Sequence, residues 1–276
     1  MRNLVVRSLS GAVFLAIVIS SLLLDKFMSA AMLLFIMVVM MHEFYAITMG
    51  KKYMVSRCLA LLCAISLFAS AFLFCCYGIP AKWLAVAILP LVAMVASSIH
   101  FITKEDFFNF AFLYAGLLYV ALPVSGANLL LFNNGEFNGL LLLGFLGLIW
   151  ASDVGAYVFG ISFGQKPGRK KLCPSISPKK SWVGFWGGLF TTVVTGVIFG
   201  LTGLFDFPLV HCVVLSLVMG VAAVYGDLFE SQWKRCYDVK DSGNIMPGHG
   251  GLLDRFDSAV VAIPAGAIYL LAAGIL

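Results

Sequence analysis

The sequence predicts an all-α, polytopic integral membrane protein with about nine transmembrane helices and a cytoplasmic N-terminus. Of its 276 residues, 62% are hydrophobic and only 11% are charged, and the mean hydropathy is +1.02. Soluble globular domains are about a quarter charged, so a soluble core cannot account for this much apolar sequence. The apolar runs are continuous rather than alternating, which argues against a transmembrane β-barrel.

Nine apolar runs are long enough to cross the hydrocarbon core, which takes about 20 mostly apolar residues per helix. No small-residue cleavage motif follows the first run, so we interpret it as a helix and not as a signal peptide. The expected spans are Leu9–Leu24, Ala30–Met49, Cys58–Tyr77, Trp83–Ile102, Phe108–Leu131, Leu140–Phe163, Val183–Leu204, Pro208–Phe229 and Ser258–Leu276.

The basic residues are distributed very unevenly between the two sides that these spans define. With a cytoplasmic N-terminus, all 18 Lys and Arg residues except Lys26 and Lys82 fall on the cytoplasmic side. This bias follows the positive-inside rule. We therefore expect a multi-pass protein of the cell membrane (the inner or plasma membrane) whose polar segments face the cytoplasm. A basic cytoplasmic face also suits contact with anionic membrane lipids, and no nucleic-acid partner is expected.

The polar segments are concentrated in the second half of the chain. Residues 1–139 are expected to form N-terminal transmembrane helices that act as a lipid-facing scaffold. Residues 140–276 are expected to form a catalytic transmembrane region with cytoplasmic loops at 164–182 and 230–257. The seven cysteines match no zinc spacing, so no metal role is assigned to them.

Asp153 lies in or near a predicted span, where a carboxylate needs a partner or a water-filled cavity. The small residues Ser152 and Gly155 beside it permit a second helix to approach closely. We therefore interpret Asp153 as a site residue, with pairing to a loop lysine as the structural alternative.

The first polar loop, GQKPGRKKLCPSISPKKSW, contains six Lys or Arg and three Pro residues. Ser177, Lys179 and Lys180 offer a hydroxyl group and cations that suit phosphate oxygens. Gly184 and the pair at 187–188 follow at a helix start, where free backbone N–H groups also favour anions. This loop is therefore predicted to bind phosphate.

The second polar loop supplies carboxylates. Asp227, Asp254 and Asp257 lie at helix ends. Hard oxygen ligands of this kind suit Mg²⁺, which is usually held by one or two carboxylates together with substrate phosphates. The same stretch supplies cations for those phosphates, at Lys234, Arg235, Lys240 and Arg255.

A glycine turn, Pro247-Gly-His-Gly-Gly251, lies between these charged groups. Gly250 and Gly251 let the backbone approach a ligand closely. His249 could donate a hydrogen bond to phosphate, act as an acid or base, or donate a structural hydrogen bond. Carboxylates, cations and a glycine turn together indicate metal-assisted phosphoryl or nucleotidyl transfer, in which positioning and charge neutralisation provide most of the catalysis.

Other motifs point elsewhere or are absent. The sequence has no Walker loop and no dinucleotide-binding glycine fingerprint. His42 and Glu43 lie deep in the second predicted span but lack the second histidine of a zinc protease. We interpret them as satisfying each other or their neighbours.

Several ordered motifs in the C-terminal half resemble the phosphatidate cytidylyltransferase (CDP-diacylglycerol synthase) family. The stretch from Ser231 to Asp257 resembles the family signature, and Gly226-Asp227-Leu-Phe-Glu-Ser231 resembles the segment that precedes it. Asp153-Val-Gly-Ala-Tyr157 and Ser177-Pro-Lys-Lys180 resemble two upstream elements. Trp233 replaces a more usual aliphatic residue, and Trp182-Val-Gly184 replaces a common acidic-glycine pair.

The resemblance implies a cytoplasm-facing site that joins CTP and phosphatidic acid to give CDP-diacylglycerol and pyrophosphate. It further implies Mg²⁺ dependence, with a second cation left open, and a homodimer. The metal-binding aspartates of the family correspond to Asp227 and Asp254. Lys234, Arg235, Lys179 and Lys180 are then expected to contact phosphates, and Ser231 to help ligate or orient. Asp257 and Asp153 are expected to tune the site or to add a second metal ligand.

Two other functions use similar residues. A CTP-dependent lipid kinase would transfer the γ-phosphate and release CDP. A cation-coupled transporter also uses intramembrane carboxylates, but it should have discontinuous helices in two corresponding halves. The polar groups of this chain gather in one half and on one face, which argues against a transporter.

Overall fold

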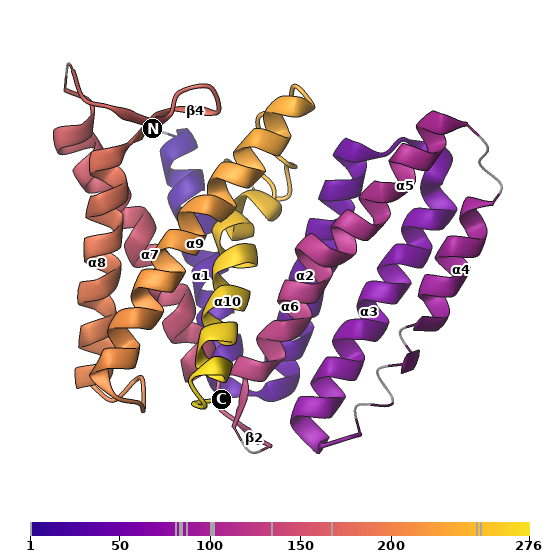
Figure 1. The fold of residues 1–276 in the computed structure, drawn as a ribbon, viewed down its shortest axis with the longest axis horizontal. Helices are drawn as coiled ribbons and strands as arrows, with labels where there is room; N and C mark the ends of the chain where they lie inside the picture. Colours follow the sequence, from indigo (N-terminus) through magenta and orange to yellow (C-terminus); the bar gives the residue numbers. More distant parts are fainter. Residues whose placement is uncertain are drawn as a thin grey trace. The chain divides into compact units, whose positions relative to one another are not determined.

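The computed structural model describes residues 2–80, 82, 85–86, 88–99, 103–133, 135–166, 168–246, 248 and 250–276. The chain divides into two compact units, Met1–Gly139 with Asp241–Arg255, and Leu140–Lys240 with Phe256–Leu276. The described residues are mainly helical, and their strands form two short antiparallel hairpins (Figure 1). The predicted all-α class is confirmed, although the hairpins were not expected from the sequence.

Local sequence signals set the ends of the first helices. Asp25 separates α1 from α2 and is the N-cap residue of α2. Its carboxylate accepts hydrogen bonds from the N–H groups of Phe27 at 2.8 Å and Met28 at 3.2 Å. Gly78, with φ of 62°, ends α3 in the left-handed conformation. The elements are α1 (Arg2–Leu24), α2 (Lys26–Thr48), the 3₁₀ turn η1 (Lys51–Tyr53) and α3 (Met54–Tyr77).

The remaining helices of the first unit are the short helix Ile88–Ser98 and the long helical segment Lys104–Leu130. Tyr45 of α2 is buried and donates a hydrogen bond to the carbonyl of Leu113 at 2.9 Å, and Gly116 leaves room for the tyrosine ring. α2 therefore packs tightly against α5. The elements are α4 (Ile88–Ser98), α5 (Lys104–Gly116), the π-helix η3 (Leu117–Ala121), α6 (Leu122–Gly126), the 3₁₀ turn η4 (Ala127–Leu130) and the strands β1 (Phe132–Asn133) and β2 (Glu136–Phe137).

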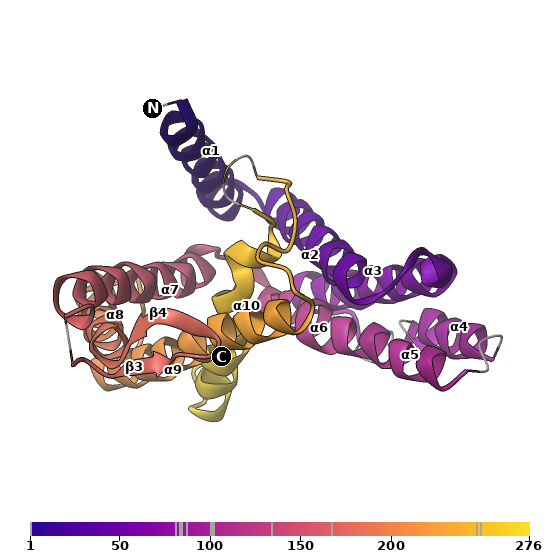
Figure 2. The same cartoon turned by 90° about the horizontal axis from the view of Figure 1, so that it is seen from above.

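The second unit contains the helices that follow residue 139. A hairpin of β3 and β4 connects α7 and α8, as Figure 2 shows. The elements are α7 (Leu140–Phe159), the π-helix η5 (Gly160–Gly164), β3 (Lys171–Cys173), β4 (Ser177–Ser181), α8 (Trp182–Leu201), α9 (Leu209–Cys236) and α10 (Leu253–Ala272), whose first turn belongs to the first unit.

Small residues let α7 and α8 approach closely. A Cβ atom at Gly188 would lie 2.8 Å from the carbonyl oxygen of Ser152, and one at Gly155 would collide with Thr191. The prediction of close helix approach around Asp153 is therefore confirmed. Gly184 was expected to offer a free N–H group to an anion, but this N–H donates to the Ser181 hydroxyl at 3.1 Å. The glycine instead allows close packing against α7, since a Cβ atom there would lie 2.9 Å from the Ala156 carbonyl oxygen.

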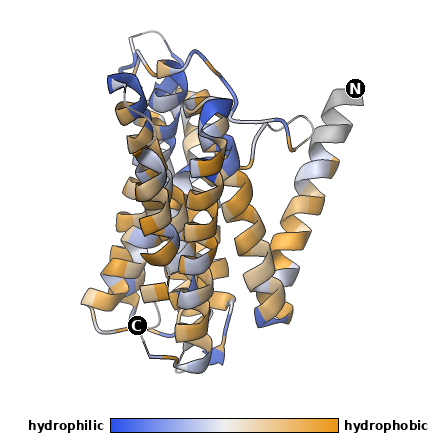
Figure 3. Cartoon of the chain, turned by 90° about the vertical axis from the view of Figure 1, so that its right-hand side faces the viewer, coloured by the Kyte–Doolittle hydropathy of each residue, from blue (hydrophilic) through white to orange (hydrophobic). Residues whose placement is uncertain are grey.

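The chain is a multi-pass membrane protein. In the described part, seven helical segments are long and apolar enough to cross a membrane, and Ser8–Leu24 and Ile88–Ser98 are shorter apolar helices. Hydrophobic residues occupy most of the helix lengths, and hydrophilic ones gather towards helix ends and connections (Figure 3). The seven segments are Lys26–Thr48, Lys51–Tyr77, Lys104–Leu130, Leu140–Gly164, Trp182–Leu201, Leu209–Cys236 and Leu253–Ala272.

Candidate active site

The end of α9 carries several of the predicted site residues. The predicted span stops at Phe229, but α9 continues to Cys236, so this part of the expected loop is helical. The helix can extend because Glu-Ser-Gln-Trp-Lys-Arg contains no glycine or proline. Lys234 and Arg235 in the last turn also stabilise the helix, since positive charge near its C-terminus interacts favourably with the helix dipole. Asp227, Ser231 and Lys234 are spaced four and three residues apart, and therefore lie on one helical face.

Asp227 forms an ion pair with Lys180 of β4. Both side chains are half-buried, and the Ser231 hydroxyl donates a hydrogen bond to Asp227 at 3.3 Å. A lysine from the first predicted loop thus reaches a carboxylate from the segment that leads into the second. The residue expected to bind phosphate contacts the residue expected to bind metal.

A second carboxylate lies beside Asp227. Gly226 brings α9 close to α10, since a Cβ atom there would lie 2.5 Å from the Asp257 carbonyl oxygen and 3.1 Å from the Ser258 Cα atom. Asp227, Asp153 and Lys234 all act electrostatically on Asp257. Carboxylates of α7 and α9 therefore contribute to the electrostatic surroundings of Asp257 in α10.

Lys234 is held by a residue that the sequence analysis did not assign to the site. Its ammonium group lies 2.5 Å from the carboxylate of Glu230, one helical turn earlier, and the Glu230 side chain is fully buried. A charged group in such surroundings requires a close partner. The i,i+4 spacing of Glu230 and Lys234 was the signal that predicts this pair.

Asp254 lies in the first turn of α10. Its side chain binds the backbone of the preceding segment, residues 242–251, in the first unit. Its carboxylate accepts the N–H of Ser242 at 2.9 Å and the N–H of Gly251 at 2.9 Å, and it is 9% exposed. Gly250 has φ of 86°, and a Cβ atom there would lie 2.6 Å from the Asp254 carboxylate. The glycines of the predicted ligand-binding turn therefore allow this turn to fold around Asp254.

Glu43 was interpreted as satisfying His42 or a neighbour, and the structure shows a different set of partners. His42 is exposed. The buried Glu43 carboxylate accepts hydrogen bonds from the Ser242 hydroxyl and from the N–H groups of Leu252 and Leu253. A carboxylate within an apolar helix was the only sequence signal for this role.

The remaining predicted residues are mostly at the surface. In the described chain, Lys179, Lys240 and Arg255 are exposed, Ser177 is half-buried in β4, and Arg235 donates to the Val239 carbonyl at 3.3 Å. His249 lies outside the described residues.

The oxygen ligands that Asp227 and Asp257 offer suit a magnesium ion that takes few protein ligands. Among the described residues, no group of three or more His, Cys, Asp or Glu side chains has metal-binding geometry. Mg²⁺ does not need such a cage, because it takes one or two carboxylates and completes its shell with water and phosphate. Asp227 and Asp257, from adjacent helices, match that requirement.

The fold defines a polytopic helical membrane protein with paired charged groups in its second unit. More specifically, the chain belongs to the Cytidylyltransferase family, whose sequence profile matches residues 5–273.

Curated relatives carry the name phosphatidate cytidylyltransferase. The chain is 47% identical over 117 residues to the Bacillus subtilis protein, a match that covers 42% of each chain. It is 37% identical over 188 residues to a Haemophilus influenzae protein, covering 66% of this chain and 64% of that one. It is 38% identical over 160 residues to a Staphylococcus aureus protein, covering 56% and 59%. The match therefore spans less than two thirds of each relative.

Proposed function

We propose that this protein transfers the cytidylyl group of CTP to phosphatidic acid, giving CDP-diacylglycerol and pyrophosphate. The names of the relatives and the family support this reaction. The single observation that carries it is the ion pair of Asp227 with Lys180, beside Asp257. This arrangement combines carboxylates for a metal with cations for phosphates at one place in the second unit.

The proposed reaction is an in-line displacement. A phosphate oxygen of phosphatidic acid attacks the α-phosphorus of CTP, and a new phosphorus–oxygen bond forms. The bond between the α-phosphorus and the bridging oxygen breaks, and pyrophosphate leaves with the electron pair. Negative charge therefore develops on the leaving group, and the protein accelerates the reaction by placing positive charge there.

Mg²⁺, when bound, would neutralise phosphate charge and orient the two substrates. Asp227 and Asp257 are the proposed ligands in the second unit, and Ser231 orients Asp227 through its hydrogen bond. Asp254 of the first unit is also proposed as a metal ligand, because its motif resembles that of a metal-binding aspartate of the family. A second cation is compatible with this set of carboxylates.

The cations divide into held and exposed groups. Lys180 and Lys234 are held by carboxylates, so we assign them to the reacting phosphates. The exposed cations, at Lys179, Lys240, Arg235 and Arg255, are assigned to substrate binding. Ser177, His249, Gly250, Gly251 and Asp153 complete the proposed substrate-binding set.

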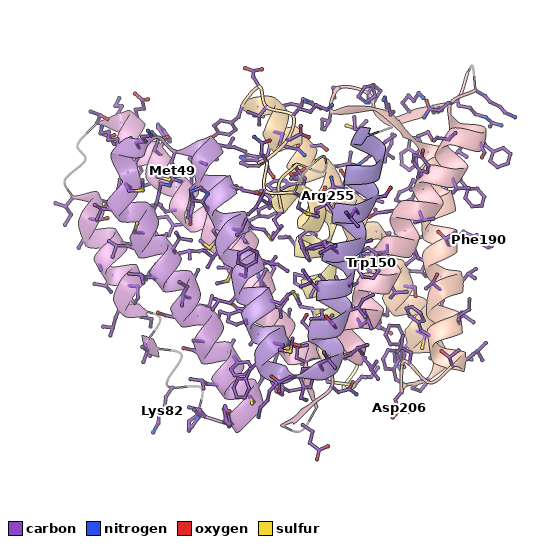
Figure 4. All side chains as sticks on the ribbon, turned by 180° about the vertical axis from the view of Figure 1, so that it is seen from behind. Met49, Lys82, Trp150, Phe190, Asp206 and Arg255 are labelled. Carbon is purple, nitrogen blue, oxygen red and sulfur yellow. The ribbon has the colours of Figure 1, made fainter. Side chains whose placement is uncertain are left out.

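The remaining proposals concern topology and assembly. We propose nine spans, a cytoplasmic N-terminus and active site, residence in the cell membrane and a homodimer. The basic residues support the orientation through the positive-inside rule. Within the first unit, Met49 and Lys82 lie at opposite ends (Figure 4), as expected for residues on opposite sides of a membrane.

The deciding experiment uses purified protein in detergent with phosphatidic acid, Mg²⁺ and CTP labelled at either the α- or the γ-phosphate. The proposal expects the α-label in the lipid product and release of unlabelled pyrophosphate from α-labelled CTP. Transfer of the γ-label to a lipid, with release of CDP, would instead identify a lipid kinase. Failure to label any lipid would contradict both enzyme functions.

A further inference from the structure

Glu43 of α2 holds the segment that leads into α10. The residue is 6% exposed, and its carboxylate accepts the N–H of Leu253 at 2.9 Å and the N–H of Leu252 at 3.0 Å. These groups stand at the start of α10, where backbone N–H groups have no partner within the helix. A negative charge at a helix N-terminus is also favoured by the helix dipole. Glu43 therefore caps α10 from another helix.

Ser242 links this cap to Asp254. Its hydroxyl donates to Glu43 at 3.1 Å and accepts the N–H of Asp254 at 3.3 Å. Its own N–H lies 2.9 and 3.1 Å from the two oxygens of the Asp254 carboxylate. Any shift of Glu43 must therefore move Ser242, and with it the carboxylate of Asp254.

The glycines of this segment are fitted to the Glu43 carboxylate. A Cβ atom at Gly243 would lie 2.5 Å from one carboxylate oxygen of Glu43, and one at Gly251 would lie 2.5 Å from the other. No side chain can occupy these positions while the glutamate is in place. The segment is thus built around Glu43. Gly250 leaves room for the Asp254 carboxylate, and Gly251 leaves room for the Glu43 carboxylate.

We infer that Glu43 is a positioning residue, which fixes the Asp254 carboxylate through Ser242 and so sets the affinity of the enzyme for Mg²⁺. The inference rests on the proposed function, which assigns Asp254 to the metal and supplies the activity readout. Its physical basis is that the hydrogen bonds that Glu43 accepts from Ser242, Leu252 and Leu253 all come from the segment that carries Asp254. Groups that orient a metal ligand typically change metal affinity by about 10- to 100-fold when they are removed.

The test compares Glu43→Gln with Asp106→Asn. Asp106 is a matched control, because it is another buried carboxylate of the first unit that accepts hydrogen bonds, from Lys52 at 2.6 Å and from Thr103 at 2.6 Å. Two quantities are measured for each purified full-length variant. They are the Mg²⁺ concentration that gives half-maximal cytidylyl transfer, and the Mg²⁺ concentration that gives half of the Mg²⁺-induced rise in melting temperature.

We expect Glu43→Gln to raise both Mg²⁺ concentrations about 10-fold, with part of the lost rate recovered at high Mg²⁺. Asp106→Asn should lower the melting temperature and leave both concentrations unchanged. An unchanged Mg²⁺ requirement in folded Glu43→Gln would overturn the inference. An equal shift in Asp106→Asn would overturn it too, because a general loss of stability would then explain the effect.

Ser242→Ala provides a second route if Glu43→Gln does not fold. It deletes the hydroxyl that joins Glu43 to Asp254 and keeps the backbone N–H that Asp254 accepts. We expect a shift in the same direction, and a wild-type Mg²⁺ requirement would contradict the inference. If the wild-type protein transfers no cytidylyl group, the proposed function fails, while the melting measurement still decides the role of Glu43.

Discussion

Lys180 of β4 and Asp227 of α9 form an ion pair inside the second unit, although they are 47 positions apart in the sequence. The pair joins a basic hairpin to an acidic helix end. Its two side chains are half-buried, so each charge is partly shielded from water and from salt. Lys180 is thereby placed where a phosphate bound beside Asp227 would meet a positive charge.

We predict that Lys180→Ala lowers kcat/KM for cytidylyl transfer by about 100-fold, the effect of losing one pre-positioned charge at a reacting centre. The control is Lys170→Ala, which removes an exposed lysine just before β3 and should have little effect. Steady-state kinetics with CTP and phosphatidic acid measure both. Equal effects of the two substitutions would mean that only the overall charge of the hairpin matters.

Gly226 provides a test of helix approach. In Gly226→Ala the new Cβ atom would lie 2.5 Å from the Asp257 carbonyl oxygen, so α9 and α10 must move apart. Misplacing reacting groups by an ångström costs about 100-fold in rate, and we expect a loss of that order. Gly126→Ala is the control, because no heavy atom lies within 4 Å of a Cβ atom at that position. Near-normal turnover in Gly226→Ala would show that the spacing of the two helices is not critical.

The Glu230–Lys234 pair should be important for stability. Removing one partner of a buried ion pair costs about 3–5 kcal/mol, because the other charge is left without compensation. We therefore expect Glu230→Gln to lower the melting temperature in detergent. The double variant Glu230→Gln/Lys234→Met should regain part of that loss, since no unpaired charge remains. Additive losses in the double variant would be inconsistent with a mutual interaction.

Metal removal tests the role of Asp227. Chelation with EDTA should abolish cytidylyl transfer, and added Mg²⁺ should restore it. Asp227→Asn, which keeps the shape but removes the charge, should require much more Mg²⁺ for the same rate. Asp206→Asn is the control, because Asp206 is exposed in the connection between α8 and α9 (Figure 4). Unchanged Mg²⁺ dependence in Asp227→Asn would remove this residue from the proposed metal site.

Hydropathy predicted the helices well, because a long apolar run is a strong and local signal. It predicted their ends less well. The run that ends at Phe229 marks where apolar sequence stops, whereas α9 stops at Cys236, because polar residues with good helix propensity continue it. Asp254 similarly falls within α10 rather than in a loop.

Contacts between residues far apart in the chain could not be predicted from the sequence. Glu43 and Ser242 are separated by 199 positions, and no spacing rule connects two residues so far apart. Composition pointed to a charged site, and the structure brings together Asp227, Lys180 and Asp257 from its parts. The partners of Asp254 could not be predicted without knowing which buried groups needed compensation, whereas the i,i+4 spacing to Glu230 indicates the partner of Lys234.

The orientation of the chain can be tested with membrane-impermeant maleimide on intact cells. Two single-cysteine variants are needed, one that keeps Cys236 at the end of α9 and one with Lys82→Cys, since both positions are exposed. Because basic residues favour the cytoplasmic side, we expect the cysteine at position 82 to react in intact cells. Cys236 should react only after the membrane is permeabilised. The reverse pattern would place the Asp227 end of α9 outside the cell, away from cytoplasmic CTP, and would contradict the proposed topology.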